Sequence, residues 1–179
     1  PFFDPEEVLK STAKQNEIKD AVKKRGLTVS ALAVHGNAVH PDPAIAKEHQ
    51  AAHETAVKLA PKLGTNIVIT FSGCPGGAKG DKTPNWVTCP WPTDFENILT
   101  YQWNDVLIPF WTKQNKLAAD QGVKIAFEAH PGFSVYNTET LLKIRKTCGK
   151  QLGANFDPSH FFWQGMDPIE SARVLGAAK

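Results

Sequence analysis

The sequence lacks the features typical of secreted, membrane-spanning and nucleic-acid-binding proteins. It has only three cysteines, Cys74, Cys89 and Cys148, with no CxxC pair, so we interpret them as free thiols in a reducing cytosol. No apolar run approaches the roughly 20 residues of a membrane span, and no signal-peptide pattern is visible. The formal net charge is only +2, without the basic excess of a nucleic-acid-binding surface. These absences predict a cytoplasmic protein that binds neither membranes nor nucleic acids.

The composition itself is that of an ordinary globular protein. The 179 residues are 41% hydrophobic and 21% charged, which is enough apolar material for a core. The chain opens without an initiator Met and closes within an apparent helix. We therefore expect residues 1–179 to form a single domain that is part of a longer protein.

Helix and strand patterns alternate along the whole chain. Helix-starting residues such as Asp42-Pro43 and Asp167-Pro168 precede amphipathic segments, and glycines follow most of them. The predicted helices cover residues 5–25 (interrupted near Ser11), 43–63, 94–121, 138–148 and 168 onward. The predicted strands cover residues 28–34, 66–71, 123–130 and 152–157. Strict alternation of this kind predicts parallel βαβ units.

The strand side chains favour a barrel over an open, doubly wound sheet. Each strand has one face of large apolar residues and one of small or polar residues that turns polar at its carboxyl end. A sheet covered on both sides should be bulky on both faces, whereas a barrel packs large residues outward against helices. We therefore expect Ile67, Ile69 and Phe71, like Ile125 and Phe127, to face outward. A full (β/α)₈ barrel needs about 250 residues, so the sequence predicts a partial TIM barrel of about four β/α units.

Two of the predicted strands end in a carboxylate that is followed by a histidine. Glu128 precedes His130, and Asp157 precedes His160. A charge at the end of a buried strand is costly unless it binds something, and the carboxyl ends of parallel strands meet at one edge of a barrel. We predict a metal or substrate site there. One alternative for Glu128 is an ion pair with Lys124, which lies ~13 Å away along the strand.

Other residues have both a functional and a structural interpretation. His35 ends the first strand on its inward face, and Asn37 and His40 follow in the same loop; turn and cap formation is the alternative for these two. Asp157 and Ser159 could simply begin a helical turn before His160. The tryptophans at 86, 91 and 163 are candidates for stacking on a sugar ring or for ordinary loop packing.

Two further motifs are poor candidates for a site. His49 and His53 lie four residues apart, a spacing that can bind zinc. Because their helix should pack outside the barrel, we expect both to be surface residues. The glycine-rich segment 74–82 lacks the GKS/GKT ending of a phosphate-binding loop.

Four segments carry a family resemblance: GNAVHPD (36–42), TFSG (70–73), FEAHPG (127–132) and NFDPSHFFWQG (155–165). Through them the chain resembles the sugar phosphate isomerase/epimerase family, the xylose-isomerase-like TIM barrels, over nearly its whole length. In that family a Glu, an Asp, a His and a second Glu hold a divalent metal at the barrel mouth. The resemblance implies that Glu128 and Asp157 are the first two ligands, and that the strands are the third to sixth of eight. The remaining ligands would follow Lys179.

The resemblance also implies a function, namely a metal-dependent isomerase or epimerase acting on a sugar or sugar phosphate. Oxygen and imidazole ligands favour Mn²⁺, Mg²⁺ or Co²⁺, with Zn²⁺ as a further option. The metal would stabilise an enediolate while catalytic residues Glu128 and His160 act on the substrate. The expected substrate-binding residues are His35, Asn37, His40, His130, His160 and Trp163.

Several alternatives stay open. They are a zinc nuclease resembling AP endonucleases, a non-catalytic sugar-binding barrel, and a lyase that uses the same enolate. A homo-oligomer is one option for the quaternary state.

Overall fold

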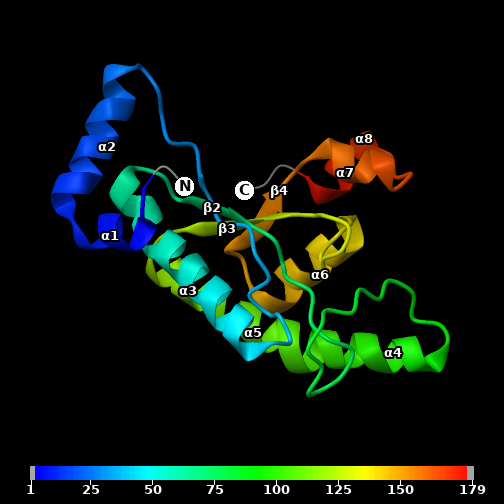
Figure 1. Cartoon of the computed structure of the whole chain (residues 1–179). Coiled ribbons are helices and arrows are strands. Elements are labelled where there is room, and N and C mark those ends of the chain that lie inside the picture. Colours follow the sequence, from blue (N-terminus) through cyan, green and yellow to red (C-terminus); the bar gives the residue numbers. More distant parts are fainter. Residues whose placement is uncertain (1–2, 177–179) are drawn as a thin grey trace.

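The computed structural model describes residues 3–176, which form a four-stranded parallel sheet with helices before, between and after its strands (Figure 1). The strands pair in chain order, each with the next. Their bounds are β1 (Leu32–Ala33), β2 (Ile67–Thr70), β3 (Lys124–Glu128) and β4 (Leu152–Asn155). The helical segments are α1 (Pro5–Lys10), α2 (Thr12–Lys24), α3 (Pro43–Leu59), η1 (Ala60–Leu63), α4 (Thr93–Thr100), η2 (Tyr101–Leu107), α5 (Ile108–Asp120), α6 (Thr138–Cys148), α7 (Pro158–Trp163) and α8 (Pro168–Leu175). The predicted parallel alternation is confirmed.

Local sequence signals explain where most helices begin. Asp4, Asp42, Asn137 and Asp167 each accept a hydrogen bond from a backbone N–H of the first helical turn, which satisfies donors that have no partner inside the helix. Ser11 ends α1 and caps α2, so the predicted interruption is confirmed. The last predicted helix ends at Leu175, and residues 177–179 lie outside the described part of the chain.

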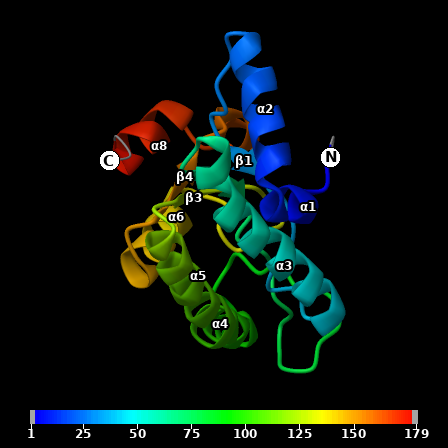
Figure 2. The same ribbon diagram turned by 90° about the vertical axis from the view of Figure 1, so that its left-hand side faces the viewer.

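Helices α3, α5 and α6 cover one face of the sheet and bury the main core against it (Figures 1 and 2). Trp111 of α5 is fully buried, lies edge-on to Phe127 with ring centroids 4.5 Å apart, and donates its indole N–H to the Ser72 carbonyl at 3.0 Å. Val68 of β2 and Ile125 of β3 are fully buried on this face, as Phe127 is. Each large apolar side chain buried in this way contributes roughly 1.5–3 kcal/mol.

The orientation predicted for β2 is wrong. Val68 pairs with Ile125 in the sheet, so it points toward the covering helices, whereas Ile67 pairs with the exposed Lys124. Ile67 and Ile69 therefore lie on the face away from the covering helices, together with Phe71. Both faces of this strand carry β-branched residues, so the sequence alternation separates the faces without indicating which one the helices cover.

The long helix predicted over 94–121 is one run of helix with a change of winding in its middle. It consists of α4, the π-helical η2 and α5 in succession. The Ile108 N–H donates to the Trp103 carbonyl, five residues back, and Pro109 follows with no N–H of its own. The wider turn places Gln102, Trp103 and Leu107 in the buried interior.

The prediction that His49 and His53 are surface residues is wrong for His53. Its side chain is only 2% exposed and lies edge-on to Trp111, with ring centroids 5.4 Å apart. Helix α3 does pack on the outside of the sheet, but the face that carries His53 packs against α5. A histidine on that face is therefore covered as completely as an apolar residue would be. His49 is half-buried and bonds to the backbone of Asn37.

A buried amide helps to hold the long segment between β2 and α4 in place. The Gln102 side-chain nitrogen faces the carbonyl oxygens of Pro75, Gly76 and Asn85, at 3.4, 3.1 and 2.6 Å. Gln102 is buried, and so are its contacts with Pro75 and Gly76. One side chain thus joins two parts of the segment, residues 75–76 and residue 85.

Replacing Gln102 with Leu is expected to loosen this segment. The substitution removes this donor from the buried Gly76 carbonyl, at a cost of roughly 1–3 kcal/mol, while the Pro75 carbonyl keeps the Asn85 N–H. We expect limited proteolysis to cut faster between residues 76 and 90, and the unfolding free energy to fall by about 2 kcal/mol. The exposed Asn104, replaced with Leu, is the control. Equal cleavage rates in the two variants would contradict this role.

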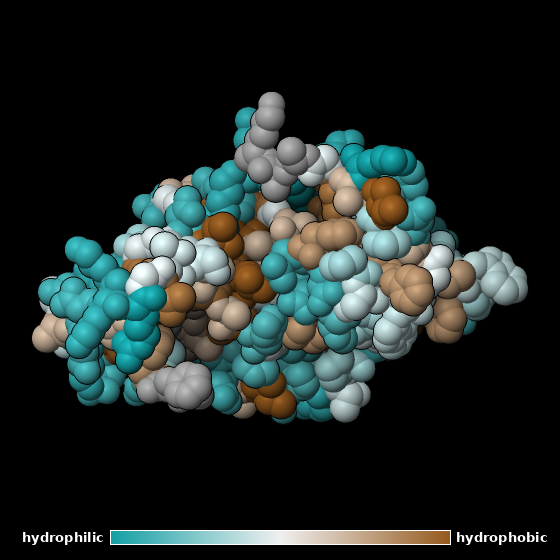
Figure 3. Space-filling view, turned by 90° about the horizontal axis from the view of Figure 1, so that it is seen from above, coloured by the Kyte–Doolittle hydropathy of each residue, from teal (hydrophilic) through white to brown (hydrophobic). Residues whose placement is uncertain are grey.

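Apolar surface gathers near the middle of the face seen in Figure 3, between more hydrophilic ends of the molecule. Large apolar side chains that stay exposed include Ile67, Phe162, Trp163, Ile169 and Val174. Among residues 3–176, no helix combines the length and the apolar character that crossing a bilayer requires.

Candidate metal and substrate site

Glu128 is the last residue of β3 and lies at the carboxyl end of the sheet. Strand alternation puts it on the opposite face from the buried Phe127. It pairs in register with Asn155 of β4, whose side-chain amide donates to Glu128 Oε2 at 3.2 Å. The carboxylate is only 17% exposed. A fixed, largely shielded carboxylate of this kind is suited to binding a cation or accepting a proton.

Asp157 caps a short helix and also faces the site. Its Oδ1 accepts hydrogen bonds from the Ser159 hydroxyl at 2.7 Å and from the Ser159 N–H at 2.9 Å. These two bonds lower the pKa of Asp157 below its usual value. The capping interpretation of Asp157 and Ser159 is therefore confirmed. It does not exclude a role in the site, because Oδ2 lies 3.7 Å from His160 Nε2.

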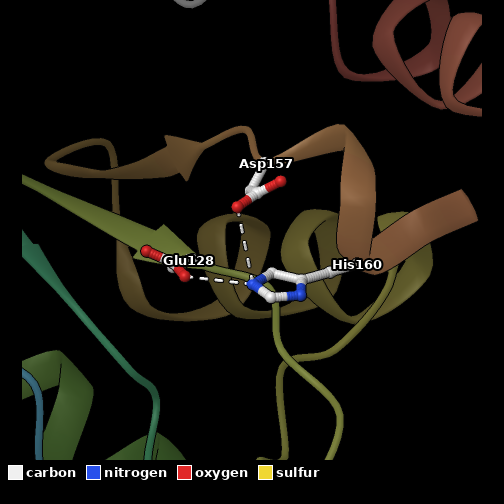
Figure 4. A group of neighbouring side chains, drawn as sticks. All are labelled: Glu128, Asp157 and His160. Atoms are coloured by element: carbon white, nitrogen blue, oxygen red, sulfur yellow. Dashed lines mark hydrogen bonds and ion pairs between the residues drawn. The ribbon is translucent and has the colours of Figure 1, made fainter. Parts of the chain in front are cut away.

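His160 brings the two carboxylates together. It lies in the first turn of α7, three residues after the capping Asp157, and its Nε2 lies 3.1 Å from Glu128 Oε1 (Figure 4). One ligand atom from each of Glu128, Asp157 and His160 lies within 4.8 Å of the others. The imidazole is 18% exposed. Three side chains thus meet at one place: Glu128 from β3, Asp157 from the residues between β4 and α7, and His160 from α7.

Two more predicted histidines adjoin this cluster. His35 Nε2 lies 3.5 Å from Glu128 Oε2, and the His35 ring lies 4.4 Å from the ring of Phe71. The His130 ring lies 4.2 Å from that of His160, while its Nδ1 lies 2.6 Å from the Pro131 carbonyl oxygen. His130 is therefore next to the site and also anchors its own loop.

The other predicted substrate-binding residues, Asn37, His40 and Trp163, are not among the residues that contact Glu128, Asp157 or His160 in the hydrogen bonds and ion pairs described above. The Asn37 side chain bonds to the backbone of Cys74, and His40 Nδ1 accepts the Asp42 N–H at 2.9 Å. Trp163 is 73% exposed at the end of α7. A substrate-binding role for these three stays a prediction. The structural alternatives for Asn37 and His40, a turn and a cap, are present.

Sequence reasoning missed Asn155 and Phe71 as parts of this site. Asn155 stands on the same strand face as Asp157, two residues earlier, so the period of two could have indicated it. Phe71 was placed on the wrong face of β2, and it stacks on Phe133 with ring centroids 4.3 Å apart, beside His35. The register between strands, which the sequence does not show, decides both positions.

The donor set fits a divalent cation. Two carboxylates and an imidazole offer oxygen and nitrogen ligands, which suit Mg²⁺, Mn²⁺, Co²⁺ or Zn²⁺. Asp157 Oδ1 is committed to Ser159, so only its Oδ2 is available. Three ligands leave coordination positions for a substrate or for further ligands.

The chain belongs to the xylose isomerase-like TIM barrel family, whose model matches residues 3–179. The four-stranded parallel sheet is accordingly part of a TIM barrel, and the predicted fold class and family are confirmed. A curated relative is the uncharacterized protein YfiH of Bacillus subtilis (strain 168), 43% identical over 181 residues. The match covers 99% of this chain and 58% of the relative.

Solved structures share the fold. A D-tagatose 3-epimerase-like protein superposes with a TM-score of 0.63 at 20% identity, over 92% of this chain and 57% of its own. A xylose isomerase-like TIM barrel protein from Mycobacterium smegmatis, in complex with magnesium, gives a TM-score of 0.63 at 15% identity, over 92% of this chain and 53% of its own. The chain thus spans little more than half the length of the proteins it matches.

Proposed function

We propose that the protein is a metal-dependent isomerase or epimerase of a sugar or sugar phosphate, and that this chain supplies Glu128, Asp157 and His160 to its active site. The observation that carries the proposal is the convergence of these three side chains at the carboxyl end of the sheet. Membership of the xylose isomerase-like family and the epimerase-like and magnesium-bound structural neighbours support it.

The residues have distinct roles in this proposal. Glu128 and Asp157 would hold a divalent cation, which would polarise the substrate oxygens as a Lewis acid. Glu128 also accepts or returns a proton at the carbon next to the carbonyl. Asn155 fixes Glu128 Oε2, so the other oxygen stays directed toward His160. His160 and His35 flank the carboxylate on its two sides and orient substrate hydroxyl groups.

Proton transfer next to a carbonyl can be observed with isotopes. The protein, expressed as its gene encodes it and loaded with Mn²⁺ or Mg²⁺, is incubated in D₂O with a panel of ketoses and their phosphates. We expect deuterium at the carbon next to the carbonyl in a substrate, together with the isomer or epimer, and loss of both after chelation of the metal. Metal analysis of the purified protein accompanies the assay.

The outcomes are separable. Isomer formation without deuterium would replace proton transfer by a hydride shift. Metal bound in stoichiometric amount, with no exchange and no isomer across the panel, would contradict the isomerase assignment. A protein that binds sugars but no metal would instead be a non-catalytic sugar-binding barrel.

A further inference from the structure

The loop that follows β1 carries His35 to the site and is held from outside by helix α3. His49 Nδ1 accepts the backbone N–H of Asn37 at 2.8 Å. The His49 ring also lies directly against Gly36, because a Cβ at that position would lie 3.0 Å from His49 Cγ. Only a residue without a side chain fits this approach without displacing the ring. One imidazole therefore contacts both residues that follow His35.

The same loop is tied to the neighbouring strand on its other side. The Asn37 side chain accepts the Cys74 N–H at 3.0 Å and donates to the Cys74 carbonyl at 2.8 Å. Cys74 follows β2, so this pair of bonds joins the segments after two adjacent strands. Asn37 is thus fixed through its backbone by His49 and through its side chain by Cys74.

His35 itself has little to hold it. Its side chain is 43% exposed, its Nε2 lies 3.5 Å from Glu128 Oε2, and its ring packs on Phe71. A contact this exposed and this long is weak. The position of the imidazole therefore depends on the backbone that carries it, which is the segment clamped by His49.

We infer that His49, remote from the reacting atoms, is a positioning residue that holds His35 beside Glu128. The inference rests on the proposed function, since it assigns His35 a place in that active site. The bond requires an acceptor at Nδ1, so His49 acts as the neutral imidazole with its hydrogen on Nε2. Asparagine at this position places its Oδ1 at the same bond from Cγ and keeps the acceptor. Leucine keeps the bulk and removes the acceptor.

The test measures how strongly His35 senses Glu128, and it needs no substrate. In the protein with labelled histidines, the His35 Cε1–Hε1 resonance is compared with and without Glu128→Gln. We expect Glu128→Gln to change the chemical shift of this resonance clearly in the wild-type background and in the His49→Asn background. In the His49→Leu background the change should be about threefold smaller, which is the comparison that a double-mutant cycle makes. The control is Lys47→Ala, an exposed position on the same helix.

A second variant approaches the same contact from the loop side. Gly36→Ala pushes a methyl group against the His49 ring, and we expect it also to reduce the response of His35. If His49→Leu does not fold, Gly36→Ala decides the matter. An unchanged response in the folded variants would overturn the inference.

The outcome is independent of the isomerase assay. If the change of the His35 chemical shift depends on His49 and the protein shows no isomerase activity, that result would support the positioning role of His49 and contradict the proposed function. Where a sugar is turned over, His49→Leu should lower kcat/KM about tenfold, and His49→Asn should restore most of it.

Discussion

Glu128→Gln is expected to lower turnover by roughly 10²–10⁴-fold while leaving the protein folded. The amide keeps the size of the side chain, and its oxygen can still accept from Asn155 while its NH₂ group faces His160. What it removes is the negative charge and the capacity to take a proton. The divalent cation loses one of its proposed oxygen ligands at the same time, so metal affinity should fall as well.

Three measurements separate these effects. Steady-state kinetics with saturating Mn²⁺ report turnover, calorimetric titration reports metal affinity, and urea unfolding reports stability, which should change by about 1 kcal/mol or less. Glu139→Gln, an exposed glutamate in the first turn of α6, is the control and should behave as the wild type does. Activity retained in Glu128→Gln would remove this carboxylate from the mechanism.

The buried His53 should make the protein sensitive to mild acid. Burial lowers the pKa of His53 from 6.5 to about 4, against a smaller opposite effect of the neighbouring Glu54. Between these values the unfolded chain binds a proton at His53 and the folded protein does not. Stability from this residue is fully present above pH 6.5 and is lost as the pH falls toward 4, by about 3 kcal/mol at most.

His53→Leu removes the titrating group and keeps an apolar side chain against Trp111. Among the described residues, neither ring nitrogen of His53 has a hydrogen-bond partner, so the substitution should cost little at pH 7. Urea unfolding at pH 7, 6 and 5 should show a shallower loss of stability in His53→Leu than in the wild type. The half-buried His40, replaced with Asn, is the control. Parallel pH profiles of the wild type and His53→Leu would show that His53 does not control the acid response.

Local chemistry explains which parts of the fold could be predicted. Asp42-Pro43 and Asp167-Pro168 satisfy helix donors within a few residues, so the starts of α3 and α8 follow from short segments of sequence. The faces of β2 and the burial of His53 depend instead on which helix lies opposite. That information comes from pairings between distant segments, such as Val68 with Ile125 and His53 with Trp111.

The residues of the candidate site also differ in whether local sequence or a distant contact determines their role. Glu128, Asp157 and His160 could be named as candidates because the two carboxylates follow apolar strand residues and the histidine comes three residues after Asp157. Their ligand atoms lie within 4.8 Å of one another, and their role in a site stays a prediction. The period of two could have indicated Asn155. His49 could not be predicted, because its role depends on a contact with Asn37 that only the folded chain makes.

The start of α7 has a consequence for the entropy of assembling the site. Asp157 is the cap of this helix and His160 stands in its first turn, so the helical backbone fixes these two side chains as one rigid pair. Only Glu128 must be brought to them, and the pairing of Glu128 with Asn155 does so. The loss of conformational freedom that the proposed three-point coordination would require is therefore largely incurred when the chain folds, and little of it would remain for the moment of binding.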